Sequence, residues 1–261
     1  MDTLLQTTLD IAEKAAKFIR EESEKVRRVD FKGATDLVTQ ADRGSENLIV
    51  DGILSRFPNH NILTEESEGQ YGKSPYTWII DPLDGTTNFV HNYPFYAVSI
   101  AVHYEETPVL GVVVDICHHY TFSAIAGQGS TQNGKSISIS NTRTLKHSLL
   151  ATGFPYVHDE IWSQNMDYFK HFTNLSQGVR RAGAASLDLC HVACGWLDGF
   201  WELELNPWDT AAGSLIVEEA GGNVTRLDGN PFSIYNNQIL ASNGRIHQEI
   251  VEEFRNVRSK T

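Results

Sequence analysis

Hydrophobic and polar residues alternate along the chain with two different periods, and each period predicts a different kind of element. In residues 3–27, and again from Ala41 to Pro58, apolar side chains recur every three or four positions between charged ones. This spacing predicts two amphipathic helices, the second of which ends before Pro58. Shorter apolar runs in the segments NILTEES and YTWIID predict strands, the second of them buried.

Residues 96–140 contain three or four predicted strands, which are separated by the turn sequences EETP, GQGS and QNGK. The dipeptide Asn133-Gly134 predicts a tight hairpin, because both residues tolerate the positive φ angles of its turn. The first half of the chain therefore predicts two helices over a largely antiparallel sheet.

The second half alternates strands with helices. Predicted strands lie in SLLATGFP and FWELEL, and predicted helices lie at 160–177, 184–199, 207–222 and 245–258. We expect the second of these helices to end at Gly199, and the third to begin at Pro207. Together the elements predict a layered α/β or α+β architecture. We expect one domain over 1–261, divided into subdomains 1–145 and 146–261.

Composition narrows the functional class. The 261 residues are 41% hydrophobic and carry a net charge of −12, which argues against nucleic acid as a direct partner. A phosphorylated small molecule remains compatible with this charge, because bound metal ions can reverse the local sign. No apolar run is long enough to span a bilayer, and the N-terminal segment predicts a helix, not a signal peptide. We therefore expect no membrane association and a cytoplasmic protein.

Three cysteines without disulfide spacing are typical of a reducing compartment. Cys190, His191 and Cys194 do not predict a zinc site, since their segment is an apolar helix and no fourth ligand has matching spacing. We expect Cys117, Cys190 and Cys194 to be buried free thiols.

The segment WIIDPLDGTTNF, from Trp78 to Phe89, carries the strongest chemical signal. Asp81 ends an apolar strand, Pro82 keeps it extended, and a turn is expected to bring Asp84 back towards it. Two carboxylates at one place repel each other unless a cation lies between them, and Mg²⁺ is the cation that carboxylates and phosphates share. Gly85 permits close approach of a ligand to the backbone.

Two further acidic segments favour a metal site over an ordinary surface turn. Glu65 and Glu66 follow an apolar strand in ILTEES, and Asp209 stands in the first turn of the helix that begins at Pro207. An aspartate there is commonly a helix cap, but a capping aspartate can also bind a metal.

The paired segments WIIDPLDGTTNF and PWDTAAGSLIVEEAGG resemble the two signatures of the inositol monophosphatase family. DLVTQAD, ILTEES and RRAGAASLDLCHVACGWLDGFWE extend the resemblance over nearly the whole chain, in the order that the family has them. The resemblance implies the sugar-phosphatase fold, an αβαβα sandwich with mixed, largely antiparallel sheets between helix layers. It also implies a lithium-sensitive, Mg²⁺-dependent phosphatase and a homodimer.

The resemblance also implies a role for each matching residue. Two or three Mg²⁺ ions would be held by Glu65, Asp81, the carbonyl of Leu83, Asp84 and Asp209. Thr86, with Asp42 behind it, would orient the attacking water, and the amides of Gly85 and Thr86 would hold the phosphate. The substrate hydroxyls would be contacted by Asp84, Ala185 and Glu202, with Arg180 nearby. Lys32 resembles a lysine near the active-site loop, although its segment is shorter here than in animal enzymes.

The sequence does not decide between several natural substrates. Asn206, Pro207 and the segment LLATGFPYVHDE resemble bacterial members of the family and lie near the alcohol half of the substrate. Inositol monophosphate or a similar polyol phosphate is one candidate; histidinol phosphate, fructose bisphosphate and a nucleotide 3′-phosphate are others. A regulatory protein that binds the transcription machinery is the alternative of a different class, and the complete carboxylate set argues against it.

Overall fold

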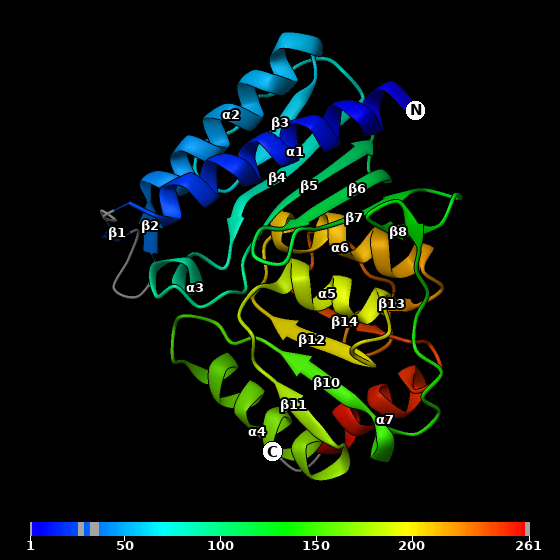
Figure 1. Cartoon of the computed structure of the whole chain (residues 1–261). Helices are drawn as coiled ribbons and strands as arrows, with labels where there is room; N and C mark the ends of the chain where they lie inside the picture. Colours follow the sequence, from blue (N-terminus) through cyan, green and yellow to red (C-terminus); the bar gives the residue numbers. More distant parts are fainter. Residues whose placement is uncertain (1, 26–28, 32–36, 259–261) are drawn as a thin grey trace.

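The structure, a computed structural model, describes residues 2–25, 29–31 and 37–258, so the expected loop residue Lys32 lies outside the described residues. Figure 1 shows five layers, in which helices α1 and α2 cover one sheet, α5 and α6 lie between the two sheets, and α4 and α7 cover the second sheet. The predicted layered αβαβα fold is therefore confirmed.

The first sheet has the strand order β3-β4-β5-β6-β7-β8-β9 within the described residues. β3 runs parallel to β4, and every other neighbouring pair is antiparallel. Residues 96–140 form five strands instead of the expected three or four, because the Asn133-Gly134 turn makes two short extra strands. The bounds are β3 Asn61–Thr64, β4 Tyr76–Asp84, β5 Ala97–Tyr104, β6 Thr107–Asp115, β7 Tyr120–Ile125, β8 Ser130–Gln132 and β9 Lys135–Ser136.

The second sheet has the order β11-β10-β12-β14-β13 in the part of the chain that the structure describes. β10 is parallel to both of its neighbours, whereas β14 is antiparallel to β12 and β13. The bounds are β10 Leu149–Thr152, β11 Gly178–Arg180, β12 Gly199–Leu203, β13 Asn223–Thr225 and β14 Gln238–Ser242; a separate hairpin pairs β1 Val29–Phe31 with β2 Leu37–Thr39.

The predicted helices are present, and several of them end earlier than expected, α5 by the most. α5 ends at Ala193, because Gly195 follows with a positive φ of 70°, and Gly199 instead begins β12. The bounds are α1 Asp2–Ser23, α2 Gln40–Arg56, α3 Thr86–Val90, a 3₁₀ turn Leu145–His147, α4 Glu160–Leu175, α5 Ala185–Ala193, α6 Pro207–Glu219 and α7 His247–Arg258.

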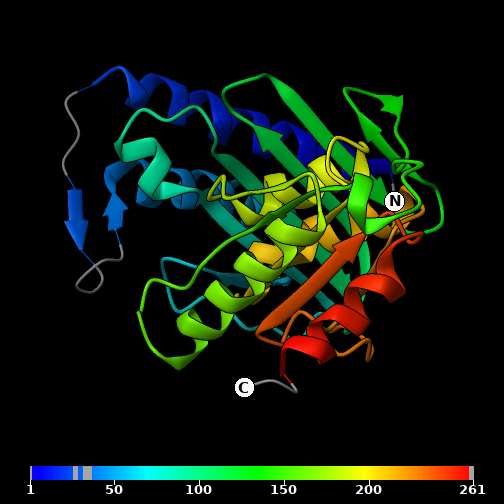
Figure 2. The same ribbon diagram turned by 90° about the horizontal axis from the view of Figure 1, so that it is seen from below.

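Two apolar clusters on opposite faces of the first sheet fix the position of β4. Trp78 and Ile80 pack with α1 and α2, whereas Ile79 packs with α5 and α6. Seen from below in Figure 2, α4 and α7 lie across the second sheet on the side away from α1. Because both faces of β4 are buried, its polar C-terminal end is held at the boundary between the two sheets.

None of the helices in the described ranges is long and apolar enough to cross a membrane. Cys190 is buried, Cys117 and Cys194 are half-buried, and all three are free thiols. Burial raises the pKa of the Cys194 thiol to about 11, which leaves it a poor nucleophile near neutral pH.

Candidate active site

The carboxyl end of β4 brings its two aspartates together by a bulge, not by the expected turn. Asp81 pairs with Ser99 and Asp84 pairs with Ala97, and the register shifts between these two pairs. The prediction of a turn was wrong because a bulge accommodates proline, which cannot donate a ladder hydrogen bond, without ending the strand. The Leu83 N–H donates to Asp81 Oδ1 over 3.0 Å and braces the bulge.

Gly85 follows the bulge and turns the chain into the short helix α3. Its φ of 91° lies in the left-handed region, and a Cβ atom there would stand 2.9 Å from the Phe95 carbonyl oxygen. A side chain at this position would therefore be both strained and obstructed. This explains physically why glycine follows the second aspartate.

A cavity of about 650 Å³ opens beside this strand end. Nine residues expected to bind metal or substrate line it, from β4, the turn that follows β4, α3, α5, β12, α6 and the segment after β3: Glu65, Asp81, Leu83, Asp84, Gly85, Thr86, Ala185, Glu202 and Asp209. These residues come from distant parts of the chain, so their convergence is a property of the fold. Asn206 and the segment LLATGFPYVHDE, which the sequence analysis placed near the alcohol half of the substrate, contribute to the lining as well, the segment through Gly153, Phe154 and Tyr156. The lining also includes Asn88 and Arg181, which the sequence analysis did not single out.

The carboxylates of the cavity disfavour one another's ionised form. Burial raises the pKa of Asp81 well above its usual range, and Glu65, Asp84 and Asp209 add repulsion. Burial raises the pKa of Asp84 to about 6, although hydrogen bonds from Ser186 oppose the shift. The pKa of Asp209 is raised chiefly by burial, and its Oδ2 accepts a capping bond from the Asn206 N–H at 2.7 Å.

Thr86, which lines the cavity, is in direct contact with Asp42, which is not among the lining residues. The Thr86 hydroxyl donates to Asp42 Oδ1 over 2.8 Å, with a longer contact of 3.1 Å to the Leu83 carbonyl. Asp42 Oδ2 accepts hydrogen bonds from the backbone N–H and hydroxyl of Thr39, in the capping box that begins α2. Asp42 is thus held by its own helix and presents its other oxygen to Thr86.

The comparisons with known proteins agree with this geometry. A model of the inositol monophosphatase family matches residues 1–259. The chain belongs to that family. An inositol-1-monophosphatase of Synechocystis is 47% identical over 253 residues, which cover 94% of this chain and 88% of that protein. The Nus factor SuhB of Pseudomonas aeruginosa is 40% identical over 260 residues, covering 96% of this chain and 95% of that protein.

Among solved structures, the inositol monophosphatase of Anabaena superposes with a TM-score of 0.87 at 39% identity, covering 98% of this chain and 96% of that one. Family membership at this identity and coverage identifies the protein as a phosphatase. The substrate, the metal and the roles of single residues are matters for a proposal.

In this phosphatase, Arg181 and not its neighbour Arg180 lines the cavity. Arg180 ends β11 and is exposed, outside the cavity lining, whereas Arg181 is the one cation among the described lining residues. Arg181 opposes the rise in pKa that burial imposes on Glu202 and on Asp188. Two adjacent arginines cannot be told apart in the sequence, because the direction of each side chain depends on how the chain leaves β11.

Glu202 lines the cavity from β12, and the exposed Glu204, just after the end of that strand, lines it as well. The Glu202 carboxylate lies so close to Gly153 that a Cβ atom at that position would overlap it. Burial is the main cause of the raised pKa of Glu202, and repulsion by Asp188 and Asp84 adds to it. Gly153 therefore makes the space that Glu202 occupies.

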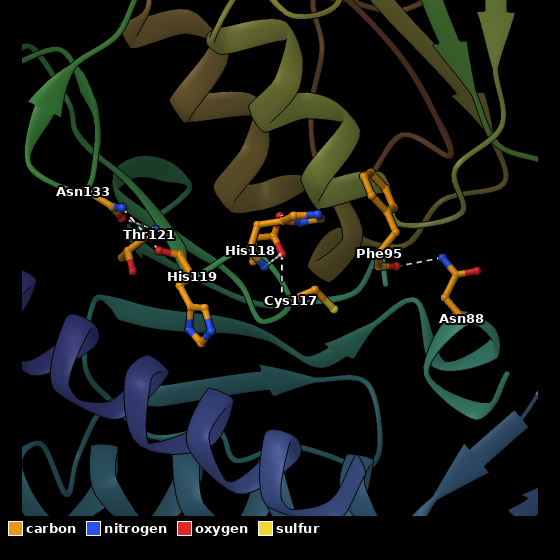
Figure 3. Close-up of polar contacts among 8 residues, drawn as sticks. Asn88, Phe95, Cys117, His118, His119, Thr121 and Asn133 are labelled. Carbon is orange, nitrogen blue, oxygen red and sulfur yellow. Dashed lines mark hydrogen bonds and ion pairs between the residues drawn. The ribbon is translucent and has the colours of Figure 1, made fainter. Parts of the chain in front are cut away.

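Asn88 joins the two sides of the cavity. Its Nδ2 donates to the Phe95 carbonyl at 2.7 Å and to the Ala182 carbonyl at 2.8 Å. Figure 3 shows the Asn88 side chain directed from its helix towards Phe95. The segment before α5 is therefore tied to α3.

Figure 3 also shows His118 and His119 beyond Phe95, at the turn between β6 and β7, and the cavity lining includes neither of these histidines.

Proposed function

We propose that this phosphatase hydrolyses the phosphomonoester of inositol or of a similar polyol, with Mg²⁺ as its cofactor. The observation that carries the proposal is the convergence on one cavity of Thr86 and the four carboxylates of Glu65, Asp81, Asp84 and Asp209. A phosphate dianion cannot enter so acidic a site without added positive charge. The similarity to the Synechocystis inositol-1-monophosphatase supports the choice of substrate class.

The donor set fits a hard divalent cation in its chemistry. Within the described residues, no three histidine, cysteine, aspartate or glutamate side chains are already grouped as the ligands of one metal ion. The carboxylates nevertheless share one cavity and repel one another. A bound divalent cation would supply the positive charge that offsets this repulsion. The residues proposed to hold it are Glu65, Asp81, the Leu83 carbonyl, Asp84 and Asp209.

When bound, the metal supplies charge neutralisation for the phosphate and for the leaving alkoxide. The protein's own contribution begins at Thr86, whose hydroxyl hydrogen is committed to Asp42 and whose oxygen lone pairs remain for the attacking water. The amides of Gly85 and Thr86 are proposed to bind the phosphate. Asp84, Ala185 and Glu202 are proposed to bind the polyol hydroxyls, and Arg181 replaces Arg180 as the nearby cation.

A phosphate-release screen of the purified protein tests the proposal. The panel contains inositol monophosphate, other polyol phosphates, histidinol phosphate, fructose bisphosphate, a nucleoside 3′-phosphate and an aryl phosphate, each with Mg²⁺ and again with excess chelator. We expect the highest kcat/KM for a polyol phosphate, loss of turnover with chelator, recovery with Mg²⁺ and inhibition by lithium. Undiminished turnover in chelator would contradict the proposed metal dependence. A higher kcat/KM for another member of the panel would replace the polyol phosphate as the proposed substrate.

A regulatory role is the second candidate, because the chain is also similar to the Nus factor SuhB of Pseudomonas aeruginosa. The complete carboxylate set favours the phosphatase reading for this chain. A folded protein that hydrolyses no panel member with Mg²⁺ or Mn²⁺ would favour the regulatory role instead. We also propose a homodimer, as the family resemblance implies, which analytical ultracentrifugation tests directly.

A further inference from the structure

The first turn of α5 makes two hydrogen bonds to one oxygen of Asp84. The Ser186 N–H donates to Asp84 Oδ2 over 2.8 Å, and the Ser186 hydroxyl donates to the same oxygen over 2.5 Å. Ser186 is fully buried, and Asp84 is nearly so. The two residues lie 102 positions apart, so the contact exists only because β4 and α5 meet at the cavity.

The Ser186 hydroxyl bonds a carboxylate from another strand and not a backbone carbonyl of its own segment. Helical serine and threonine hydroxyls commonly donate to a carbonyl one turn back, as Thr8 does to Leu4 and Ser163 does to Asp159. Ser186 stands in the first turn of its helix, where its own N–H has no helical partner and faces out of the end of the helix. Both of its donors are therefore available to a carboxylate, and Asp84 receives both.

We infer that Ser186 is a positioning residue for Asp84, an inference that rests on the proposed function. Two donors on Oδ2, together with an interaction from the Ala185 backbone, restrain the carboxylate that Asp84 presents to the cavity. A carboxylate that binds a metal must hold its orientation in spite of the repulsion from its acidic neighbours. Ser186 supplies that restraint from outside the metal site, without touching the substrate or the reacting atoms.

The inference predicts a specific loss when the hydroxyl is removed. Ser186→Ala keeps the backbone N–H bond but deletes the hydroxyl bond, so Asp84 is restrained less firmly. We expect Mg²⁺ to bind roughly tenfold more weakly, the magnitude typical of a hydrogen bond to a charged group. The kcat at low Mg²⁺ falls by a similar factor and is recovered by raising Mg²⁺, while KM for the phosphate ester changes little. A merely structural serine would show no recovery by Mg²⁺.

Ser148→Ala is the matched control. Ser148 is also fully buried, and its hydroxyl donates one short bond, of 2.6 Å, to the Leu145 carbonyl, away from the cavity. Ser186→Cys retains a weak donor in nearly the same volume and should lie between the wild type and Ser186→Ala. If Ser186→Ala does not fold, Mg²⁺ binding by Ser186→Cys is compared with that of the wild type instead.

The experiment measures Mg²⁺ binding to the three variants and the wild type by titration calorimetry without substrate, beside the Mg²⁺ dependence of kcat. Weaker binding by Ser186→Ala, intermediate binding by Ser186→Cys and unchanged binding by Ser148→Ala support the inference. Equal Mg²⁺ binding by wild type and both Ser186 variants overturns it while leaving the proposed function intact. Absence of Mg²⁺ binding and of phosphate release in the wild type overturns both.

Discussion

The Thr86 hydroxyl donates a hydrogen bond to Asp42 Oδ1 over 2.8 Å, across 44 positions of the chain. Asp42 is fully buried at the start of α2, and Thr86 begins α3 at the end of the β4 bulge. The direction of the bond is fixed when Asp42 is ionised, because a carboxylate only accepts. Thr86 therefore offers its oxygen to the cavity as an acceptor for a proton of the attacking water.

Replacing Thr86 by valine removes that acceptor at nearly constant shape. We expect kcat for inositol monophosphate to fall by roughly a hundredfold or more, the magnitude typical of one proton-transfer partner. Thr86→Ser is the matched control, because it keeps the hydroxyl and should retain most of the turnover. Equal losses in both variants would assign Thr86 to packing. The measurement is steady-state phosphate release at saturating Mg²⁺.

Asp84→Asn and Asp209→Asn each remove one charge from the acidic cluster. We expect kcat to fall by orders of magnitude, because charge stabilisation at the metal site is the main catalytic contribution. The free energy of unfolding in chelator should stay the same or rise, since the raised pKa of both carboxyls shows that folding disfavours their charge. The amide oxygen of asparagine can still accept the bond from Ser186 or Asn206.

Urea denaturation of the metal-free variants at pH 8 measures this effect. At that pH the carboxyl of Asp84, with a folded pKa of about 6, is ionised, so the repulsion that the asparagine relieves is fully present. A large loss of stability in either variant would mean that the aspartate holds the fold. Turnover close to that of the wild type would show that the replaced aspartate is not one of the metal ligands.

Glu202→Gln tests the choice of a polyol substrate. Glu202 lies seven residues before Asp209 and lines the same cavity, but a carboxylate there repels phosphate and can help only a hydroxyl-bearing leaving group. We expect kcat/KM for inositol monophosphate to fall roughly tenfold, as for the loss of one charge-assisted hydrogen bond, with an aryl phosphate almost unaffected.

Glu106→Gln, on an exposed residue in the turn between β5 and β6 that does not line the cavity, is the matched control and should change neither substrate. Equal losses on both substrates in Glu202→Gln would assign Glu202 to the metals or the fold. No loss on either substrate would remove the main structural argument for a polyol.

His247 should make the protein sensitive to acid. Its Nδ1 lies 2.8 Å from Ser242 Oγ and its Nε2 lies 2.8 Å from Thr225 Oγ1, and burial lowers its pKa to about 4. An unfolded histidine, with a pKa of about 6.5, binds a proton below that pH while the folded one does not. The free energy of unfolding therefore falls as pH falls from about 6.5 to about 4, by on the order of 3 kcal/mol.

His103 and His191, which burial shifts to about the same pKa, act in the same direction, so His247→Asn should reduce the slope without abolishing it. Urea denaturation between pH 7 and pH 4.5 measures the slope. His119→Asn, in an exposed turn with a positive φ that asparagine tolerates, is the matched control and should leave the slope unchanged. If the free energy of unfolding of His247→Asn changes with pH as steeply as that of the wild type, His247 does not contribute to the acid sensitivity.

Local signals in the sequence determined most of the elements and the acidic residues at their ends. Pro207 and the glycines after Glu219 bound α6, and the Asn133-Gly134 pair makes the predicted hairpin. These features could be predicted because proline, glycine and the period of apolar residues act within a few positions. Asp81, Asp84 and Asp209 were found in the same way, since each lies at a recognisable strand or helix boundary, whereas Ala185 and Glu202 came from the resemblance to the family.

The tertiary structure decided what depends on contacts between distant segments. The β4 bulge, the choice of Arg181 over Arg180 and the end of α5 at Ala193 each differ from the sequence prediction. The bond from Ser186 to Asp84 has no local signal, because a serine in a first helical turn is ordinary until a carboxylate from another strand meets it. Sequence spacing fixes which groups a segment presents, but only packing decides which way they point and what they meet.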